Sequence, residues 1–140
     1  MQEEEPFSDL KLEDIREHWH WVKHGVEEVI EKTGATYIAE DVYAKCIYKD
    51  AHLFLNEGIF YIVTVTTDEF NMKKSLCLWI TWASIVHTKK ELNNHINYFS
   101  KIAKEQGCSF LETGSPITKL GTYLVSIDFK PVVTWYKKEI

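Results

Sequence analysis

The 140-residue sequence predicts one mixed α/β domain in which helices flank a central, mostly antiparallel sheet. Apolar residues recur every three or four positions in two long stretches, 12–33 and 88–106, as they do on one face of a helix. Two runs rich in β-branched and aromatic residues, 51–55 and 58–67, are separated by the turn sequence Asn-Glu-Gly, which is typical of a β-hairpin. Another apolar run, 75–83, hardly alternates, which indicates a strand covered on both faces.

The first half of the chain begins with helical spacing. In the helix predicted over 12–33, Gly25 weakens the middle and Gly34 stands where a C-terminal cap is expected. Its apolar stripe consists of Leu12, Ile15, Trp19, Val22, Val26, Val29 and Ile30. A second, shorter helix is predicted over 40–49, with Val42, Tyr43, Cys46 and Ile47 facing inward. The hairpin and the third strand follow these helices.

Thr88 and Glu91 form a capping box at the start of the best-defined helix. Its apolar stripe is Leu92, Ile96, Phe99, Ile102 and Ala103, and Gly107 is expected to end it. Residues 108–113 are predicted to form a fourth strand. Ser115 and Pro116 favour the start of a helix that extends to 127, and a final strand is predicted over 131–139.

Charge and hydropathy exclude several classes of partner. The net charge is −5 and the lysines are scattered, so we expect no nucleic-acid binding. No apolar run approaches the roughly 20 residues that cross a bilayer, so we expect no membrane association. Residues 1–7 are expected to be a flexible acidic tail and 8–140 a single domain. An acidic N-terminus is unlike a signal peptide, which favours a cytoplasmic protein, and the three cysteines are expected to be small buried apolar residues.

The predicted order of elements resembles the GNAT acyltransferase fold, in which acetyl-CoA lies between two splayed central strands. The closing sequence "YLVSIDFKPVVTWYKKE" is similar to the usual ending of that family, with Phe129, Lys130 and Pro131 matching and Asp128 in the place of a glycine. The stretch "HWHWVKHGVEEVIEKTGATYIAEDVYA" also resembles small GNAT-like proteins of tailed bacteriophages. This resemblance implies a GNAT-like fold for most of the chain.

Two parts that the resemblance leads one to expect are missing. Active GNAT enzymes carry a glycine-rich loop after the third of these strands, where backbone amides approach the pyrophosphate at a helix N-terminus. Here the matching stretch is "SIVHTKKEL", which has no glycine. The tyrosine that often protonates the leaving thiolate is replaced by Leu124, and Tyr123 is turned by about 100° along a helix.

We therefore expect a non-catalytic GNAT-fold protein that acts through protein–protein contacts and has no cofactor. It is expected to be able to form a homo-oligomer. If it is phage-encoded, we expect it in the host cytoplasm or in the virion. The alternative is an acetyl-CoA-dependent N-acetyltransferase with an atypical pyrophosphate loop, in which acetyl-CoA would contact Trp82, Ala83, Ser84 and Lys89.

Other candidates for chemistry have simpler interpretations. Glu112 or Glu69 could act as a general base in an acetyltransferase, although an exposed glutamate is the ordinary case. Cys108 could pair with His87 or His95 as a nucleophile, but a strand cysteine more often packs in the core. His20 and His24 share a helix face as zinc ligands would, yet no further ligand is placed to complete a site, so no metal is expected.

Overall fold

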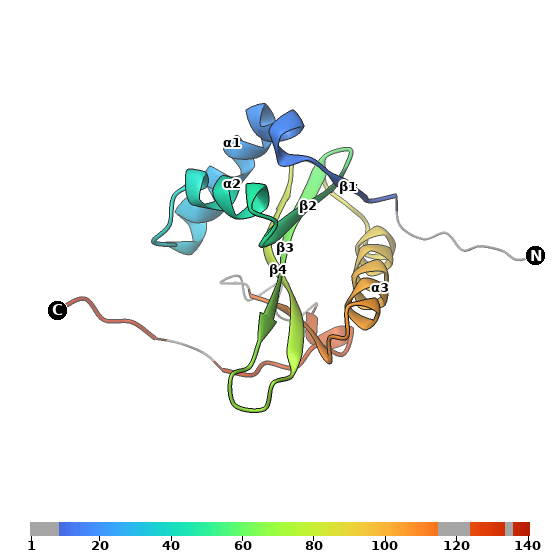
Figure 1. The fold of residues 1–140 in the computed structure, drawn as a ribbon. Coiled ribbons are helices and arrows are strands. Elements are labelled where there is room, and N and C mark those ends of the chain that lie inside the picture. Colours follow the sequence, from blue (N-terminus) through green and yellow to red (C-terminus); the bar gives the residue numbers. More distant parts are fainter. Residues whose placement is uncertain (1–8, 115–123, 134–135) are drawn as a thin grey trace, which may run out of the picture.

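The computed structural model describes residues 9–114, 124–133 and 136–140. Its elements follow one another in the order β1, α1, α2, β2, β3, β4, α3 and β5 (Figure 1). Their bounds are β1 Lys11–Glu13, α1 Ile15–Thr33, α2 Ala39–Ile47, β2 Ala51–Asn56, β3 Ile59–Thr67, β4 Lys74–Ala83, α3 Lys89–Glu105 and β5 Phe110–Thr113. The predicted mixed α/β class is confirmed.

The strands form one sheet in the order β1-β2-β3-β4-β5. Neighbouring strands are antiparallel except for β4 and β5, which are parallel. The predicted hairpin joins β2 to β3 through Glu57 and Gly58, and the φ of Gly58 is 77°, a conformation that glycine adopts without steric cost. The prediction of a mostly antiparallel sheet is therefore confirmed.

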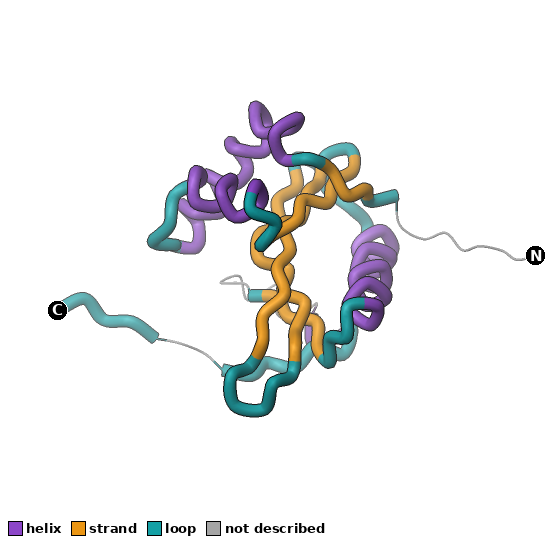
Figure 2. The backbone as a smooth tube through the Cα atoms, viewed as in Figure 1, coloured by secondary structure: helices purple, strands orange, loops and turns teal. Residues whose placement is uncertain are grey.

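Helices cover both faces of this sheet (Figure 2), with α1 and α2 on one face and α3 on the other. Alternation along β3 divides the core between the two faces. Phe60 and Ile62 face α1 and α2, while Tyr61 and Val63 face α3. Both layers of the core are rich in apolar and aromatic side chains, and they fix the position of β4 between them.

The start of α1 differs from the prediction. Leu12 lies in β1 and is 60% exposed, because Lys11–Glu13 pairs with the end of β2 and leaves no helical turn there. The helix begins at Ile15, since the Asp14 carboxylate accepts a hydrogen bond from the backbone N–H of Arg16. The Arg16 guanidinium also binds this carboxylate and lowers the pKa of Asp14 to about 2. The predicted cap at Gly34 is confirmed by its φ of 69°.

The predicted helix after the third strand is confirmed as α3. Thr88 Oγ1 accepts from the backbone N–H of Glu91 at 3.1 Å, and the Glu91 carboxylate accepts from the Thr88 N–H at 2.7 Å. Phe99 is fully buried against Phe54 and Tyr61, and the other predicted positions of the stripe pack on the same side. The capping box and the apolar stripe therefore act as the sequence predicts.

The end of the chain departs from the prediction. Residues 124–126 are helical, whereas the rest of the predicted helix, 115–123, lies outside the described residues, as does the tail, 1–7. The described residues of the predicted final strand, 131–133 and 136–139, are not in a strand, so that prediction is wrong for them. Val132 is 91% exposed, because strand propensity without a pairing partner in the sheet does not make a strand. Asp128 has a φ of 75°, a left-handed backbone conformation that glycine adopts more readily than other residues.

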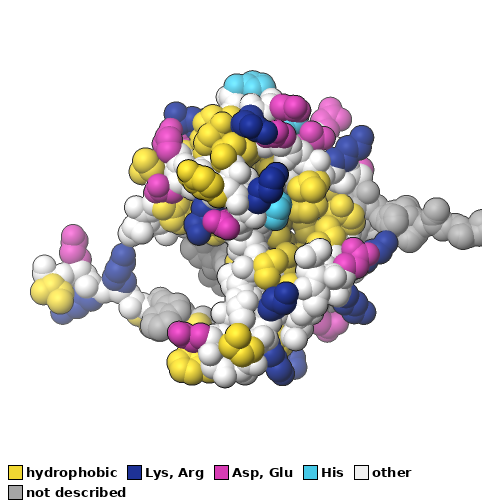
Figure 3. Space-filling view, in the orientation of Figure 1, with side chains coloured by type: hydrophobic (Ala, Val, Ile, Leu, Met, Phe, Trp, Pro, Cys, Tyr) yellow, Lys and Arg dark blue, Asp and Glu magenta, His cyan; other side chains and the backbone are white. Residues whose placement is uncertain are grey.

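The surface is mixed in charge (Figure 3), with acidic and basic side chains interspersed on the face shown. Within the described part of the chain, no helix combines the length and apolar character that a membrane crossing requires. The three cysteines are unpaired and partly buried, and burial raises the pKa of the Cys46 thiol to about 11.

Candidate functional site

Strands β4 and β5 separate half-way along β4. They pair from Ser75 opposite Phe110 to Leu78 opposite Thr113, and β4 then continues to Ala83. On its other side β4 stays paired with β3 as far as Ala83, opposite Ile59. The edge of β4 from Trp79 to Ala83 that faces away from β3 therefore has no strand partner among the described residues.

A β-bulge lies where the two strands separate. Ile62 pairs with Ile80 and Val63 with Leu78, so Trp79 is the extra residue in β4. The extra residue reverses the alternation of the strand. Leu76 and Leu78 pack on the α3 side, whereas Ile80, and with it Trp79 and Trp82, packs on the side of α1 and α2. The bulge thus aims an additional large side chain at the α1 and α2 face.

Two polar side chains lie on that face near the bulge. Tyr37, in the connection between α1 and α2, packs against Trp79 with ring centroids 5.3 Å apart. Burial raises the pKa of the Tyr37 phenol, and a hydrogen bond with the Trp79 side chain partly offsets this effect. Glu112 lies opposite Cys77 in the β4–β5 register, and since its neighbour Leu111 packs toward α3, the exposed Glu112 points to the α1 and α2 face. The sequence pattern points to Glu112 but carries no signal for Tyr37.

The loop from β4 to α3 contains no glycine and leads into the N-terminus of α3. Val86 is 98% exposed, and Ile85 is also exposed. The Glu91 carboxylate already accepts the Thr88 amide, and this hydrogen bond lowers the pKa of Glu91. Only the Lys89 and Lys90 amides of this first turn have no acceptor among the described residues. A negative charge of the protein itself therefore occupies the positive end of the α3 dipole.

The structure separates the predicted cofactor residues. Trp82 is part-buried, stacks on Phe60 and donates its indole N–H to Glu28 at 2.9 Å, so it faces α1. Ser84 is exposed, and its backbone N–H donates to the Gly58 carbonyl at 2.8 Å. Ala83 is exposed at the end of β4, and Lys89 is exposed as the first residue of α3. Trp82 and Ser84 line one pocket together, and Ala83 and Lys89 do not line it.

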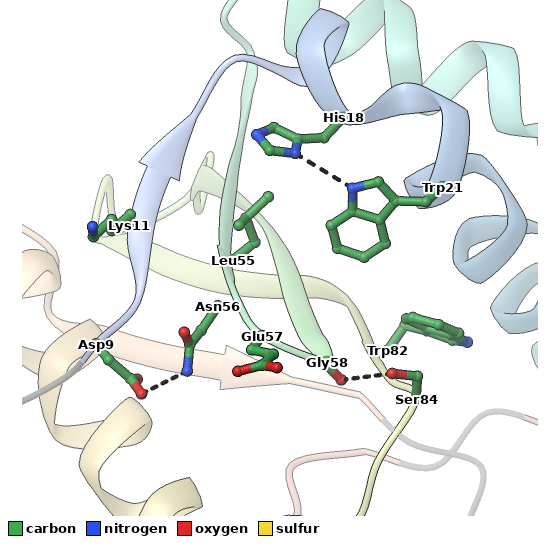
Figure 4. A pocket seen from close by; sticks show the side chains of 10 residues that line it. All are labelled: Asp9, Lys11, His18, Trp21, Leu55, Asn56, Glu57, Gly58, Trp82 and Ser84. Atoms are coloured by element: carbon green, nitrogen blue, oxygen red, sulfur yellow. Dashed lines mark hydrogen bonds between the residues drawn. The ribbon is translucent and has the colours of Figure 1, made fainter.

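That pocket has a volume of about 450 Å³ and lies between α1, β1, the β2–β3 turn and the end of β4 (Figure 4). Trp21 and His18 of α1 close one side, and Asp9, Asn56 and Glu57 lie on the opposite side. Sequence patterns do not reveal it, because its walls come from segments that are far apart in the chain. The only local signal is Trp21 within the "HWHW" cluster.

A buried histidine links this region to α3. His95 is 2% exposed; its Nδ1 lies 3.0 Å from the Tyr61 hydroxyl and its Nε2 lies 3.4 Å from an Asp9 carboxylate oxygen. Burial lowers the pKa of His95, and the hydrogen bond with Asp9 partly offsets the shift. No hydrogen bond joins Cys108 to His87 or His95 among the described residues, so the geometry does not support a cysteine nucleophile.

The histidines of α1 are not arranged as a zinc site among the described side chains. His24 pairs with Glu28 at 2.8 Å, and His20 is exposed. Glu13, Glu17 and His18 gather instead, with ligand atoms within 4.8 Å of one another. The Trp21 indole donates to His18 Nδ1, which leaves the proton of the neutral imidazole on Nε2, the atom that faces Glu13. A metal would need that nitrogen unprotonated.

No family model and no curated protein sequence matches the chain. Solved structures do match it, and they share its fold. A probable acetyltransferase matches with a TM-score of 0.68 and 13% identity, over 94% of this chain and 97% of that one. The ribosomal-protein-alanine N-acetyltransferase of Brucella melitensis biovar Abortus 2308 matches with a TM-score of 0.63 and 13% identity, over 94% and 99%. A transcriptional regulator from Bacillus halodurans C-125 matches with a TM-score of 0.64 and 11% identity, over 94% and 99%. Such low identities show the fold and not the activity, and the chain thus has the fold of the GNAT-type acetyltransferases.

Proposed function

We propose that the chain is an acetyl-CoA-dependent N-acetyltransferase with an atypical, weak contact to the pyrophosphate. The observation that carries this proposal is the separation of β4 from β5 after Leu78, with the bulge at Trp79 at the point of separation. The fold similarity to proteins described as acetyltransferases supports it.

The unpaired edge of β4 suits an extended ligand that carries amide groups. From Trp79 to Ala83 the strand offers backbone donors and acceptors that no described strand uses. An extended chain can complete such an edge by main-chain hydrogen bonds, as in β-strand addition. The pantetheine arm of coenzyme A is extended and contains two amide groups, so it can take the place of a strand there.

The thioester of acetyl-CoA would supply the acetyl group, and the protein would supply proton transfer. An amine acceptor must lose a proton before or during attack, and the exposed carboxylate of Glu112 on the α1 and α2 face can accept it. The thiolate that leaves must be protonated. A phenol is protonated at neutral pH, so Tyr37, which packs against Trp79 at the bulge, can donate to that thiolate in place of the tyrosine that Leu124 replaces.

The α3 N-terminus fits a pyrophosphate only in part. Two backbone amides, those of Lys89 and Lys90, remain available for an anion, but the Glu91 carboxylate repels it. The bulky side chains of Ile85 and Val86 replace the glycines that allow close approach of a ligand. We therefore expect the affinity to come mainly from the β4 edge.

Isothermal titration calorimetry at physiological salt tests binding. We expect a dissociation constant for acetyl-CoA between about 10 µM and about 1 mM. Glu91→Gln removes the opposing charge and should tighten binding about twofold to fivefold, since a charge at a helix end contributes about 0.3–1 kcal/mol. Glu105→Gln, at the other end of α3, is the matched control and should leave the affinity unchanged. No heat of binding up to about 1 mM would contradict the proposal.

Acetyl transfer to a panel of primary amines, including protein N-termini, tests catalysis. Glu112→Gln should lower kcat by about 100-fold or more, and Tyr37→Phe should lower kcat with little change in KM. Glu69→Gln is the control, because Glu69 is an exposed glutamate in the β3–β4 loop. Equal activities of the Glu112→Gln and Glu69→Gln variants would remove Glu112 from the mechanism.

A second candidate function is a non-catalytic module for protein–protein contact, in or around a phage particle. The exposed apolar side chains of Ile85 and Val86, at the place where catalytic relatives would need glycine, favour it. In that case acetyl-CoA would not bind, and replacing both residues by serine would abolish capture of a protein partner without loss of stability.

A further inference from the structure

The pocket between α1 and the β2–β3 turn has two indole walls whose polar atoms are already engaged. The Trp21 N–H donates to His18 Nδ1 at 3.3 Å, and the Trp82 N–H donates to a Glu28 carboxylate oxygen at 2.9 Å. Both rings therefore contribute carbon and π-surface to the pocket and cannot donate hydrogen bonds to an anion. Such surfaces attract organic cations, because the face of an indole is the negative end of its quadrupole.

The charges around the pocket favour the same class of ligand. Two carboxylates, Asp9 and Glu57, line it against one ammonium group, that of Lys11. In Figure 4 the Asp9 and Glu57 side chains lie across the pocket from Trp21, with Trp82 at one end. Asn56 Nδ2 donates to one Asp9 oxygen, and His95 Nε2 approaches the other, which fixes the carboxylate although its side chain remains 66% exposed. Neither Glu57 nor Lys11 forms an ion pair with any described side chain.

We propose that this pocket is a binding site for a small organic ammonium ion with an aromatic or aliphatic body. The ammonium group lies toward Asp9 and Glu57, and the body contacts the rings of Trp21 and Trp82. The volume of about 450 Å³ is in the range of small-molecule sites and admits an arylalkylamine. The proposed acetyl-CoA contacts use the backbone edge of β4 from Trp79 to Ala83, whereas this pocket uses the Trp82 and Ser84 side chains together with α1, β1 and the β2–β3 turn.

The test uses three probes of nearly equal shape: phenethylamine, which is a cation, 2-phenylethanol, which is neutral, and phenylacetate, which is an anion. The full chain, labelled with ¹⁵N, is titrated in an NMR experiment that observes its five tryptophan indole N–H signals. Phenethylamine should shift the signals of Trp21 and Trp82, assigned by single substitution, and should leave those of Trp19 and Trp79 in place. Phenylethanol should bind more weakly, and phenylacetate should not bind.

Glu57→Gln is the decisive variant, because Glu57 is exposed in a turn and its replacement keeps the fold. It should weaken phenethylamine binding about twofold to fivefold, as expected for one solvent-exposed charge, and the effect should shrink at high salt. Glu69→Gln, a distant exposed glutamate, should not change the affinity. Equal binding of the three probes, shifts at Trp79 in place of Trp21 and Trp82, or the same affinity in Glu57→Gln and Glu69→Gln would overturn the proposal.

This titration, taken together with the calorimetry of acetyl-CoA, separates this proposal from the proposed function. Phenethylamine binding without acetyl-CoA binding would support the ammonium pocket and contradict the acetyltransferase. Acetyl-CoA binding without any phenethylamine shift would do the opposite.

Discussion

Gly25 lies in the middle of α1, and its replacement by alanine tests how closely α1 packs on the sheet. A Cβ at this position would lie 2.6 Å from Cε2 of Phe60, 2.6 Å from Cδ2 of Trp82 and 2.8 Å from Cγ of Trp82. All these distances are far below van der Waals contact. The Trp82 atoms are at the base of the side chain, whose indole N–H is held by Glu28, and Phe60 is fully buried, so neither ring can swing away.

The magnitude follows from two opposing terms. Alanine in a helix interior is more favourable than glycine by roughly 0.5–1 kcal/mol. Overpacking of a rigid core site costs about 1–3 kcal/mol, and contacts this short belong to the upper part of that range. We expect Gly25→Ala to lower the free energy of unfolding by about 2 kcal/mol, where helix propensity alone predicts a gain.

Urea denaturation followed by circular dichroism measures the effect. Gly114→Ala is the control, because a Cβ there meets no described atom within 4 Å, and its stability should change by less than about 0.5 kcal/mol. In a Trp82→Leu background the added methyl group has more room, so the cost of Gly25→Ala should fall by about 1 kcal/mol. If Gly25→Ala were as stable as the parent chain, α1 would not pack on Phe60 and Trp82 in this way.

Three further predictions concern α3. Phe99→Ala should lower the free energy of unfolding by about 3–5 kcal/mol, because the buried ring packs against Phe54 and Tyr61. The control Phe70→Ala removes a ring that is 91% exposed and should cost less than about 0.5 kcal/mol in the same denaturant melts. Thr88→Ala should cost about 0.5–2 kcal/mol through the lost cap and leave phenethylamine binding unchanged; weaker binding at equal stability would indicate a ligand contact. Burial lowers the pKa of His95 in the folded state, so the unfolded chain binds its proton first and stability should fall as the pH drops below about 6.5. His95→Gln should reduce this acid-side loss in melts between pH 7 and about 5, and the exposed control His52→Gln should not; equal slopes would contradict the assignment.

The sequence by itself determined the elements whose signals are local. Helical spacing, the Thr88–Glu91 capping box, the cap at Gly34 and the turn before Ile59 each depend on residues a few positions apart. The hydrogen bonds and steric preferences behind them are therefore already encoded in short stretches of chain. The same holds for the absence of glycine between β4 and α3, which is a property of the sequence alone.

Tertiary structure decided the features that depend on distant segments. Residues 11–13 form a strand only because β2 supplies a pairing edge, and the described part of 131–139, with no such edge, does not form one. Gly25 weakens α1 locally, yet Phe60 and Trp82 require it. The bulge at Trp79, the buried His95 and the pocket next to Trp21 likewise arise from register and packing between elements. Local propensities contribute from a few tenths of a kcal/mol to about 1 kcal/mol per residue. Burial and steric exclusion between elements contribute several kcal/mol at a buried site, so the long-range contacts prevail wherever the two disagree.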